Sequence, residues 1–93
     1  MRFKKTISEG DIKSEANAWA TLRGWMNVGI KLATENGWPD HVYIRRGVTR
    51  WVEWKKPGGS LDPLQIERIQ QMLDHGAEVR VFDNLQDFKE WMF

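Results

Sequence analysis

The chain has 93 residues, a formal net charge of +1 and no cysteine, which excludes disulfide frameworks and thiolate metal sites. Its length predicts one domain, 1–93, and a domain this small buries a limited share of its surface, so we expect it to gain from a partner chain. No apolar run approaches ~20 residues and the start MRFKK is not followed by an apolar segment, so we expect a cytoplasmic protein without membrane span or secretory signal.

The first third of the chain predicts a helix and then a short strand. Ser8 followed by Asp11 is typical of a helix start, and apolar residues recur at helical spacing up to Met26, so we expect a helix over residues 8–26. Apolar residues alternate from Val28 to Leu32, which indicates a short strand. The segment TENGWP, residues 34–39, has the composition of a loop.

The middle of the chain predicts a β-hairpin. The runs HVYIRR and VTRWVEWKK, residues 41–46 and 48–56, are rich in β-formers and flank Gly47. A loop centred between Arg46 and Gly47 places Asp40 opposite Glu53, whereas a loop centred on Gly47 shifts the pairing by one residue. Either register makes Asp40 and Glu53 near neighbours.

The last third predicts a helix, a strand and a second helix. Asp62 and Pro63 read as N-cap and first helical residue, and Gly76 as the stop. AEVRVF then predicts a strand over residues 78–82, and Asn84 opens a last helix. The order α, β, β, β, α, β, α predicts an α/β fold.

The paired acidic residues indicate a metal site. Like charges placed opposite each other destabilise a sheet, so Asp40 and Glu53 need a counter-charge. Mg²⁺ prefers hard oxygen ligands and is commonly held by one or two carboxylates. Because strand side chains alternate, Lys55 shares a face with Glu53 and would stabilise charge developing on a phosphate. The alternative is that this Glu-x-Lys pair simply faces solvent.

Basic residues concentrate around the same hairpin. Within twelve positions the chain places Arg45, Arg46, Arg50, Lys55 and Lys56. We interpret Arg45, Arg46, Arg50 and Lys56 as DNA-phosphate contacts; a solvated charged face is the alternative.

Together these features resemble a known nuclease superfamily. Pro-Asp before one strand and Glu-x-Lys on its partner form the pattern of the PD-(D/E)XK nucleases. WPD followed by a hairpin, VEWKKPGGSLDPLQ and a helix ending before GAEVRVF are similar to the VRR-NUC branch, from about Glu15 to the C-terminus. The resemblance implies a restriction-endonuclease-like core, a small mixed β-sheet flanked by helices.

The resemblance also implies the roles of the site residues. Asp40, Glu53 and the backbone carbonyl of Trp54 would hold Mg²⁺ or Mn²⁺, with Lys55 as the catalytic lysine. Gln65 would reach the site from the second helix, although its spacing from the N-cap also fits a capping box.

The family's early helix supplies a glutamate to the site as well. Glu15 fits that position best, directly or through a water, and Glu9 less well. Glu15 shares a helix face with Trp19 and Leu22, so it would point inward.

The resemblance further implies a structure-specific DNA endonuclease of a bacterial or phage-infected cell. Because a small domain offers little area to duplex DNA, we expect a homodimer that resolves four-way (Holliday) junctions. Flap-type or general nuclease activity, and a non-catalytic nucleic-acid-binding module, are the alternatives.

The apolar C-terminal residues and two tryptophans leave two interpretations each. Trp91, Met92 and Phe93 contribute to the subunit contact or pack on their own sheet. Trp25 or Trp38 stacks on an unpaired base or, like the other tryptophans, supplies core area.

Overall fold

The computed structural model describes residues 8–31 and 35–93, beginning with helix α1, Glu9–Leu22. Ser8 and Asp11 cap its start reciprocally, as the sequence predicts. The helix ends four residues earlier than expected, because Gly24 adopts φ +87° and the N–H of Trp25 bonds back to the carbonyl of Ala20 at 3.0 Å. This is a Schellman ending, in which glycine takes the left-handed conformation.

Three antiparallel strands follow, β1 (Met26–Gly29), β2 (His41–Arg45) and β3 (Val48–Trp54). Strand β1 begins two residues before the predicted strand; Leu32 and Thr34, the ends of two predicted segments, lie outside the described residues. Arg45 pairs with Val48, so the hairpin turn is centred between Arg46 and Gly47, the first of the two predicted registers.

Helix α2 (Pro63–Asp74), strand β4 (Glu78–Phe82) and helix α3 (Leu85–Met92) complete the fold. Strand β4 lies parallel to β3, which requires a crossover, and α2 provides it. The strand order β1-β2-β3-β4 makes a four-stranded mixed sheet. The prediction of an α/β fold with a small mixed sheet flanked by helices is confirmed.

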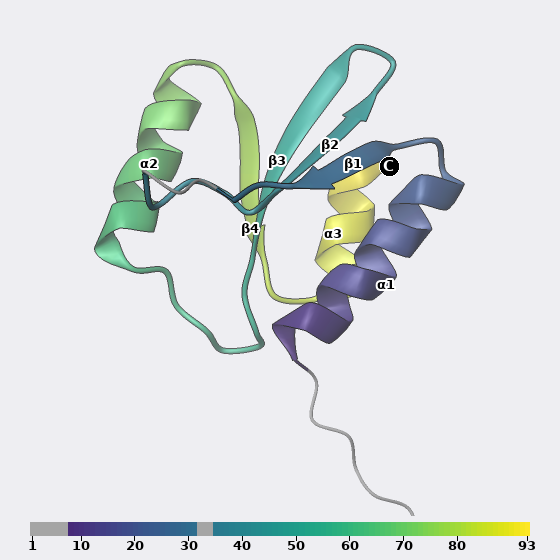
Figure 1. The fold of residues 1–93 in the computed structure, drawn as a ribbon, viewed down its shortest axis with the longest axis horizontal. Coiled ribbons are helices and arrows are strands. Elements are labelled where there is room, and N and C mark those ends of the chain that lie inside the picture. The colour runs from purple at the N-terminus through teal and green to yellow at the C-terminus, as the bar shows by residue number, and fades with distance from the viewer. Residues whose placement is uncertain (1–7, 32–34) are drawn as a thin grey trace, which may run out of the picture.

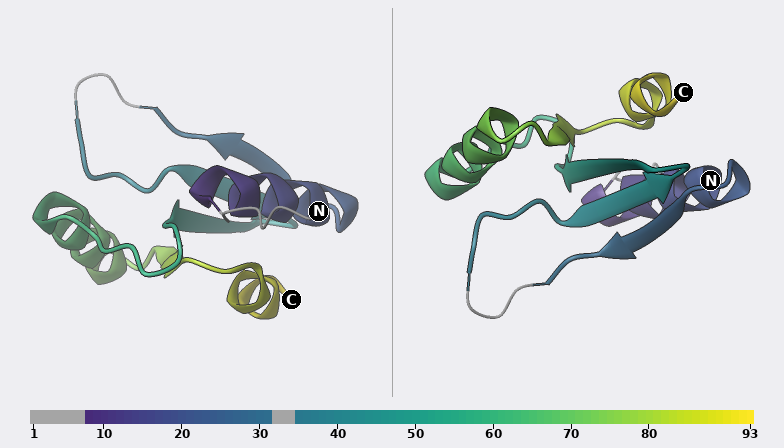
Figure 2. Two further views of the ribbon diagram at one scale, coloured as in Figure 1. Left: turned by 90° about the horizontal axis from the view of Figure 1, so that it is seen from below. Right: turned by 90° about the horizontal axis from the view of Figure 1, so that it is seen from above.

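The helices lie on both sides of the sheet. Figure 1 shows α2 on one side of the strands and α1 with α3 on the other, and in both views of Figure 2 the helices α2 and α3 lie well apart. Because side chains alternate along β3, Val52 and Trp54 face α1 and α3, whereas Trp51 and Glu53 face α2. Among the described residues, no helix is long and apolar enough to cross a membrane.

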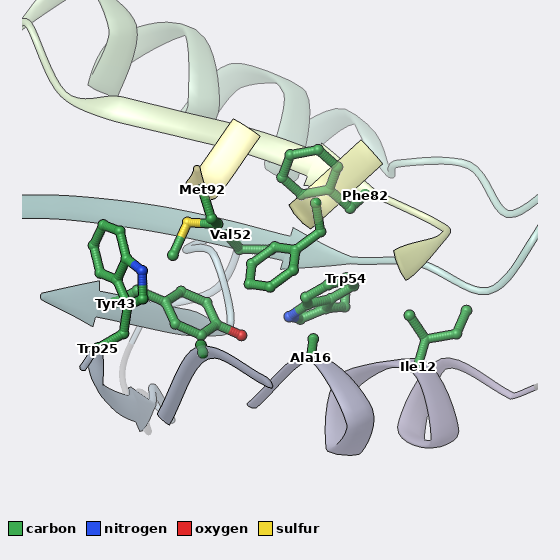
Figure 3. Packing of buried hydrophobic residues seen from close by; sticks show 10 residues of the cluster. Ile12, Ala16, Trp25, Tyr43, Val52, Trp54, Phe82 and Met92 are labelled. Carbon is green, nitrogen blue, oxygen red and sulfur yellow. The ribbon is translucent and has the colours of Figure 1, made fainter. Parts of the chain in front are cut away.

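The hydrophobic core fills the layer between the sheet and the pair α1 and α3. Figure 3 shows the rings of Tyr43 and Trp54 between Ala16 of α1 and the side chains of Phe82 and Met92. All five are at most 5% exposed. This packing positions β2, which directly follows Asp40, and β3, which carries Glu53.

Trp25 and the C-terminal residues can now be assigned to the core or to the surface. Trp25 is buried in the core, so it is not a surface for base stacking. Trp91 packs against the core and Met92 is 1% exposed, so both pack on their own sheet, whereas Phe93 is 85% exposed.

Candidate functional site

Asp40 and Glu53 meet where β2 begins and β3 ends. His41 pairs with Val52, and continuing this register by one pair brings Asp40 opposite Glu53. The Glu53 side chain lies inside the protein, at 6% exposure, and the Lys55 Nζ is 3.7 Å from its Oε2. The structure therefore brings these three predicted residues together and confirms that Glu53 and Lys55 share one face.

Gln65 joins this group from the first turn of α2. Its Nε2 donates to Glu53 Oε2 at 3.2 Å, while its Oε1 accepts from the backbone N–H of Asp62 at 3.1 Å. Asp62 in turn accepts from the Gln65 N–H at 2.9 Å. The capping box and the contact with Glu53 are both present, because the two ends of one amide serve them separately.

Both carboxyl groups are held in surroundings that disfavour their charge. Burial, and next the charge of Asp40, raise the pKa of Glu53 to about 7, although Lys55 opposes the rise. Burial also raises the pKa of Asp40, against the lowering effect of Lys13. With Glu9 also acting on the pair, three carboxyl groups share two nearby lysines, and a bound cation would relieve this shortage of positive charge.

Helix α1 contributes Lys13 and Glu9 to the site. The sequence analysis named Glu9, as a poorer candidate than Glu15, and did not name Lys13. Lys13 Nζ lies 3.6 Å from Asp40 Oδ1, and the charge of Glu9, four residues earlier, raises the pKa of both Asp40 and Glu53. Residues four apart on a helix share a face. Helical spacing in the sequence does not show which polar face of α1 lies against the sheet. The packed structure is therefore needed to identify Lys13 as the neighbour of Asp40.

Glu15 is placed differently from the expectation. It is exposed rather than turned inward, and it lines a hollow of about 300 Å³ together with Pro57 and Asp83. Leu22, expected on the same inward face, is 88% exposed. The buried face of α1 instead follows Ile12 and Ala16, so the prediction that Glu15 points inward is wrong.

The backbone at Trp54 faces Asp40. The backbone N–H of Lys55 donates to the Phe82 carbonyl at 2.8 Å, so the backbone groups of Lys55 point toward β4. Because backbone groups alternate in direction along a strand, those of Trp54 point the other way, toward β2. There the Trp54 N–H interacts with the Asp40 carboxylate and lowers its pKa. Continuing the register of β2 and β3 by two pairs beyond His41 and Val52 brings Pro39 opposite Trp54. Proline has no N–H to donate to the Trp54 carbonyl. The carbonyl predicted as a metal ligand therefore lies where that strand neighbour cannot bond to it.

The donor set fits a hard divalent cation. Asp40 Oδ1 is buried and has no hydrogen-bond partner among the described residues, while the Lys13 Nζ lies 3.6 Å away as an ion-pair partner. Two carboxylates and a carbonyl oxygen are ligands typical of Mg²⁺ and Mn²⁺. Within residues 8–31 and 35–93 no cluster of three or more acidic, histidine or cysteine side chains could hold a metal, so water or substrate would supply the remaining ligands.

The four basic residues predicted to contact DNA differ in their surroundings. Arg45 donates to a backbone carbonyl at the end of α1 at 2.9 Å, and Arg50 donates to the Trp91 carbonyl at 2.6 Å. These two arginines have structural partners. Arg46, in the hairpin turn, and Lys56, after β3, are exposed and stay predicted phosphate contacts.

The backbone conformation after β3 explains the two glycines of the Pro57-Gly58-Gly59 segment. Gly58 adopts φ +77°, which L side chains rarely take. A Cβ on Gly59 would stand 3.0 Å from the Lys56 carbonyl oxygen. The turn that follows Lys55 thus favours glycine at position 58 for its backbone conformation and at position 59 for the close approach of the Lys56 carbonyl.

Comparison with solved structures gives a likeness of fold. No protein-family model matches the chain, and no curated protein matches it either. A solved structure described as a "VRR_NUC domain" is similar to it with a TM-score of 0.82 and 23% sequence identity, covering 90% of this chain and 92% of the other. At this identity the likeness concerns the fold, and it agrees with the resemblance in the sequence. The chain therefore has the restriction-endonuclease-like fold of a VRR_NUC domain.

Proposed function

We propose that this protein is a divalent-metal-dependent DNA endonuclease that hydrolyses phosphodiester bonds. The observation that carries the proposal is the half-buried Asp40 next to the buried Glu53, with Lys55 beside them, in the fold of a VRR_NUC domain. Asp40, Glu53 and the Trp54 carbonyl would hold Mg²⁺ or Mn²⁺. Bound there, the cation would act as a Lewis acid on the phosphate.

The side chains around the carboxylates have separate roles. Lys55 places a positive charge beside Glu53, where it would stabilise the charge that develops on the phosphate in the transition state. Gln65 fixes the Glu53 carboxylate through its amide, and Lys13 does the same for Asp40 by its charge. Both act as positioning residues.

The test is cleavage of single-stranded, duplex, flap and four-way-junction DNA with Mg²⁺, by wild type and by Lys55→Ala. Cleavage by the wild type that Lys55→Ala abolishes supports the proposal. Cleavage unchanged in Lys55→Ala would remove this site from the chemistry. Binding without cleavage under several metals would favour the non-catalytic module.

We further propose that the substrate is a four-way junction and the active form a homodimer. A two-fold dimer carries two equivalent sites, as paired nicks across a junction require, whereas flap cleavage needs one. Met26, Val28 and Ile44 of the adjacent strands β1 and β2 are 71%, 53% and 38% exposed, and β1 is an edge of the sheet. An exposed apolar edge of this kind favours pairing with a second copy.

Two measurements separate the junction dimer from a flap enzyme. Light scattering should give twice 11.0 kDa, and junction cleavage should yield paired nicks. A monomer that cuts flaps and ignores junctions would contradict the dimer and the junction preference, but not the nuclease assignment.

A further inference from the structure

A second hollow, of about 500 Å³, lies between α2 and the sheet. Its lining includes two indole rings, a guanidinium, and two exposed polar side chains, from Trp38, Trp51, Arg68, Gln71 and His75. We propose that it binds an unpaired nucleobase of the DNA, next to the phosphate that is cleaved. The inference rests on the proposed nuclease function and adds to it a feature of the substrate.

The hollow lies next to the carboxylate site along β3 and α2. Trp51 precedes Glu53 by two residues on the same face of β3, a separation of about 7 Å along a strand. Arg68 follows Gln65 by three residues, roughly one turn of α2. Strand β3 and helix α2 thus each present one side chain to the carboxylate site and one to the hollow, about one nucleotide's reach apart.

The aromatic groups are held in place before any ligand arrives. Trp38 and Trp51 have ring centroids 6.2 Å apart, and the Arg68 guanidinium lies 4.6 Å from the Trp38 ring. Glu35 fixes both partners, accepting from Trp38 Nε1 at 2.8 Å and lying 3.8 Å from an Arg68 nitrogen. Rings that are already ordered lose little conformational freedom when a base stacks on them.

The polar groups match a base better than an aliphatic ligand. Arg68 Nε is buried and has no hydrogen-bond partner within the described part of the chain, so a side chain that lines the hollow holds a donor without an acceptor. Gln71 and His75 are exposed residues of its lining, and the Gln71 Oε1 accepts from Arg68 at 3.2 Å, which leaves the amide N–H groups of Gln71 for a base edge. A mainly apolar pocket with a few polar groups is typical of ligand sites, and 500 Å³ lies in their usual range. Indole stacking is the common way in which proteins hold unpaired bases.

The experiment compares flaps, and four-way junctions with an unpaired insert at the branch point, that carry either 2-aminopurine or an abasic site at one unpaired nucleotide. Binding is measured with Ca²⁺ in place of Mg²⁺, together with quenching of the 2-aminopurine fluorescence. The proteins are wild type, Trp38→Ala, Trp38→Phe, and Phe93→Ala as a control, because Phe93 is an exposed aromatic residue outside the hollow.

The expected result is a position where wild type quenches 2-aminopurine and binds the base roughly tenfold more tightly than the abasic site. Trp38→Ala should lose both effects, Trp38→Phe should keep most of them, and Phe93→Ala should keep them fully. Equal binding of base and abasic DNA by wild type, or a preference that survives in Trp38→Ala, would overturn the inference.

Two further outcomes separate this inference from the proposed function. Wild type that cleaves DNA without any base preference contradicts the base site alone. Wild type that neither binds nor cleaves DNA contradicts both. If Trp38→Ala instead changes the oligomeric state in light scattering, the hollow is a subunit contact and the inference is wrong.

Discussion

Replacing Glu53 by glutamine should stabilise the metal-free protein while removing its response to divalent cations. The pKa of Glu53 is raised from 4.5 to about 7, chiefly by burial. One pKa unit corresponds to ~1.4 kcal/mol, so keeping this group ionised in the folded chain at pH 8 costs on the order of 3 kcal/mol. Glutamine is nearly isosteric, still accepts from Gln65, and carries no charge to bury.

The sign of the pH dependence follows from the raised pKa. A carboxyl group whose pKa is higher in the folded state stabilises the fold below pH 4.5, and that contribution is lost as the pH rises through about 7. The advantage of Glu53→Gln should therefore be full at pH 8 and nearly absent at pH 4.5. His41 titrates in the opposite sense, since burial lowers its pKa to about 4, but it is present in both proteins and cancels in the difference.

Urea unfolding in EDTA at pH 5 and pH 8 measures the difference in unfolding free energy between Glu53→Gln and wild type. In thermal unfolding at pH 8, the Tm of Glu53→Gln should be roughly 10 °C or more above that of wild type. Added Mg²⁺ should stabilise wild type by mass action and Glu53→Gln much less. Glu67→Gln, at an exposed carboxylate of α2, is the control and should change stability by less than ~0.5 kcal/mol. A Glu53→Gln protein less stable than wild type at pH 8 without metal would refute the reasoning, since the contacts of Glu53 would then outweigh its burial.

Three other substitutions test the site and the assembly. Asp40→Asn should weaken Mg²⁺ binding in calorimetry by about tenfold or more, because it removes the charge of a carboxylate whose buried Oδ1 has no hydrogen bond within the described residues; unchanged affinity would place the metal elsewhere. Lys55→Ala should lower the cleavage rate by ~100-fold or more with DNA binding retained, as gel shifts would report. Val28→Lys should give a monomer in light scattering, whereas Ile66→Lys, at a residue with similar exposure (55% against 53%), should leave the dimer intact; equal behaviour of the two would argue against β1 as the contact.

The hairpin and its carboxylates were predictable because they depend on local rules. Strand alternation places Glu53 and Lys55 on one face, and a two-residue turn fixes which residue opposes which. Arg46 and Gly47 have φ of 49° and 79°, as such a turn requires. The function of Gln65 in the capping box also follows from spacing alone.

The contributions of α1 were not predictable in the same way. Its charged residues recur around the helix, and the sequence does not say which of them will lie against the end of the sheet. Packing through Ile12 and Ala16 turns Lys13 toward Asp40 and leaves Glu15 exposed. The arginines of the hairpin show the same limit, since Arg50 bonds to a carbonyl forty-one residues away in the chain.

The double role of Gln65 links the carboxylate site to the local unfolding of α2. Its amide closes the first turn of the helix and also holds Glu53, so fraying of that turn releases the carboxylate. Protonating Glu53 or ordering it on a ligand changes the free energy of the same opening. The rate of amide hydrogen exchange in the first turn of α2 should therefore change when Glu53, twelve positions earlier on β3, is protonated or binds a ligand.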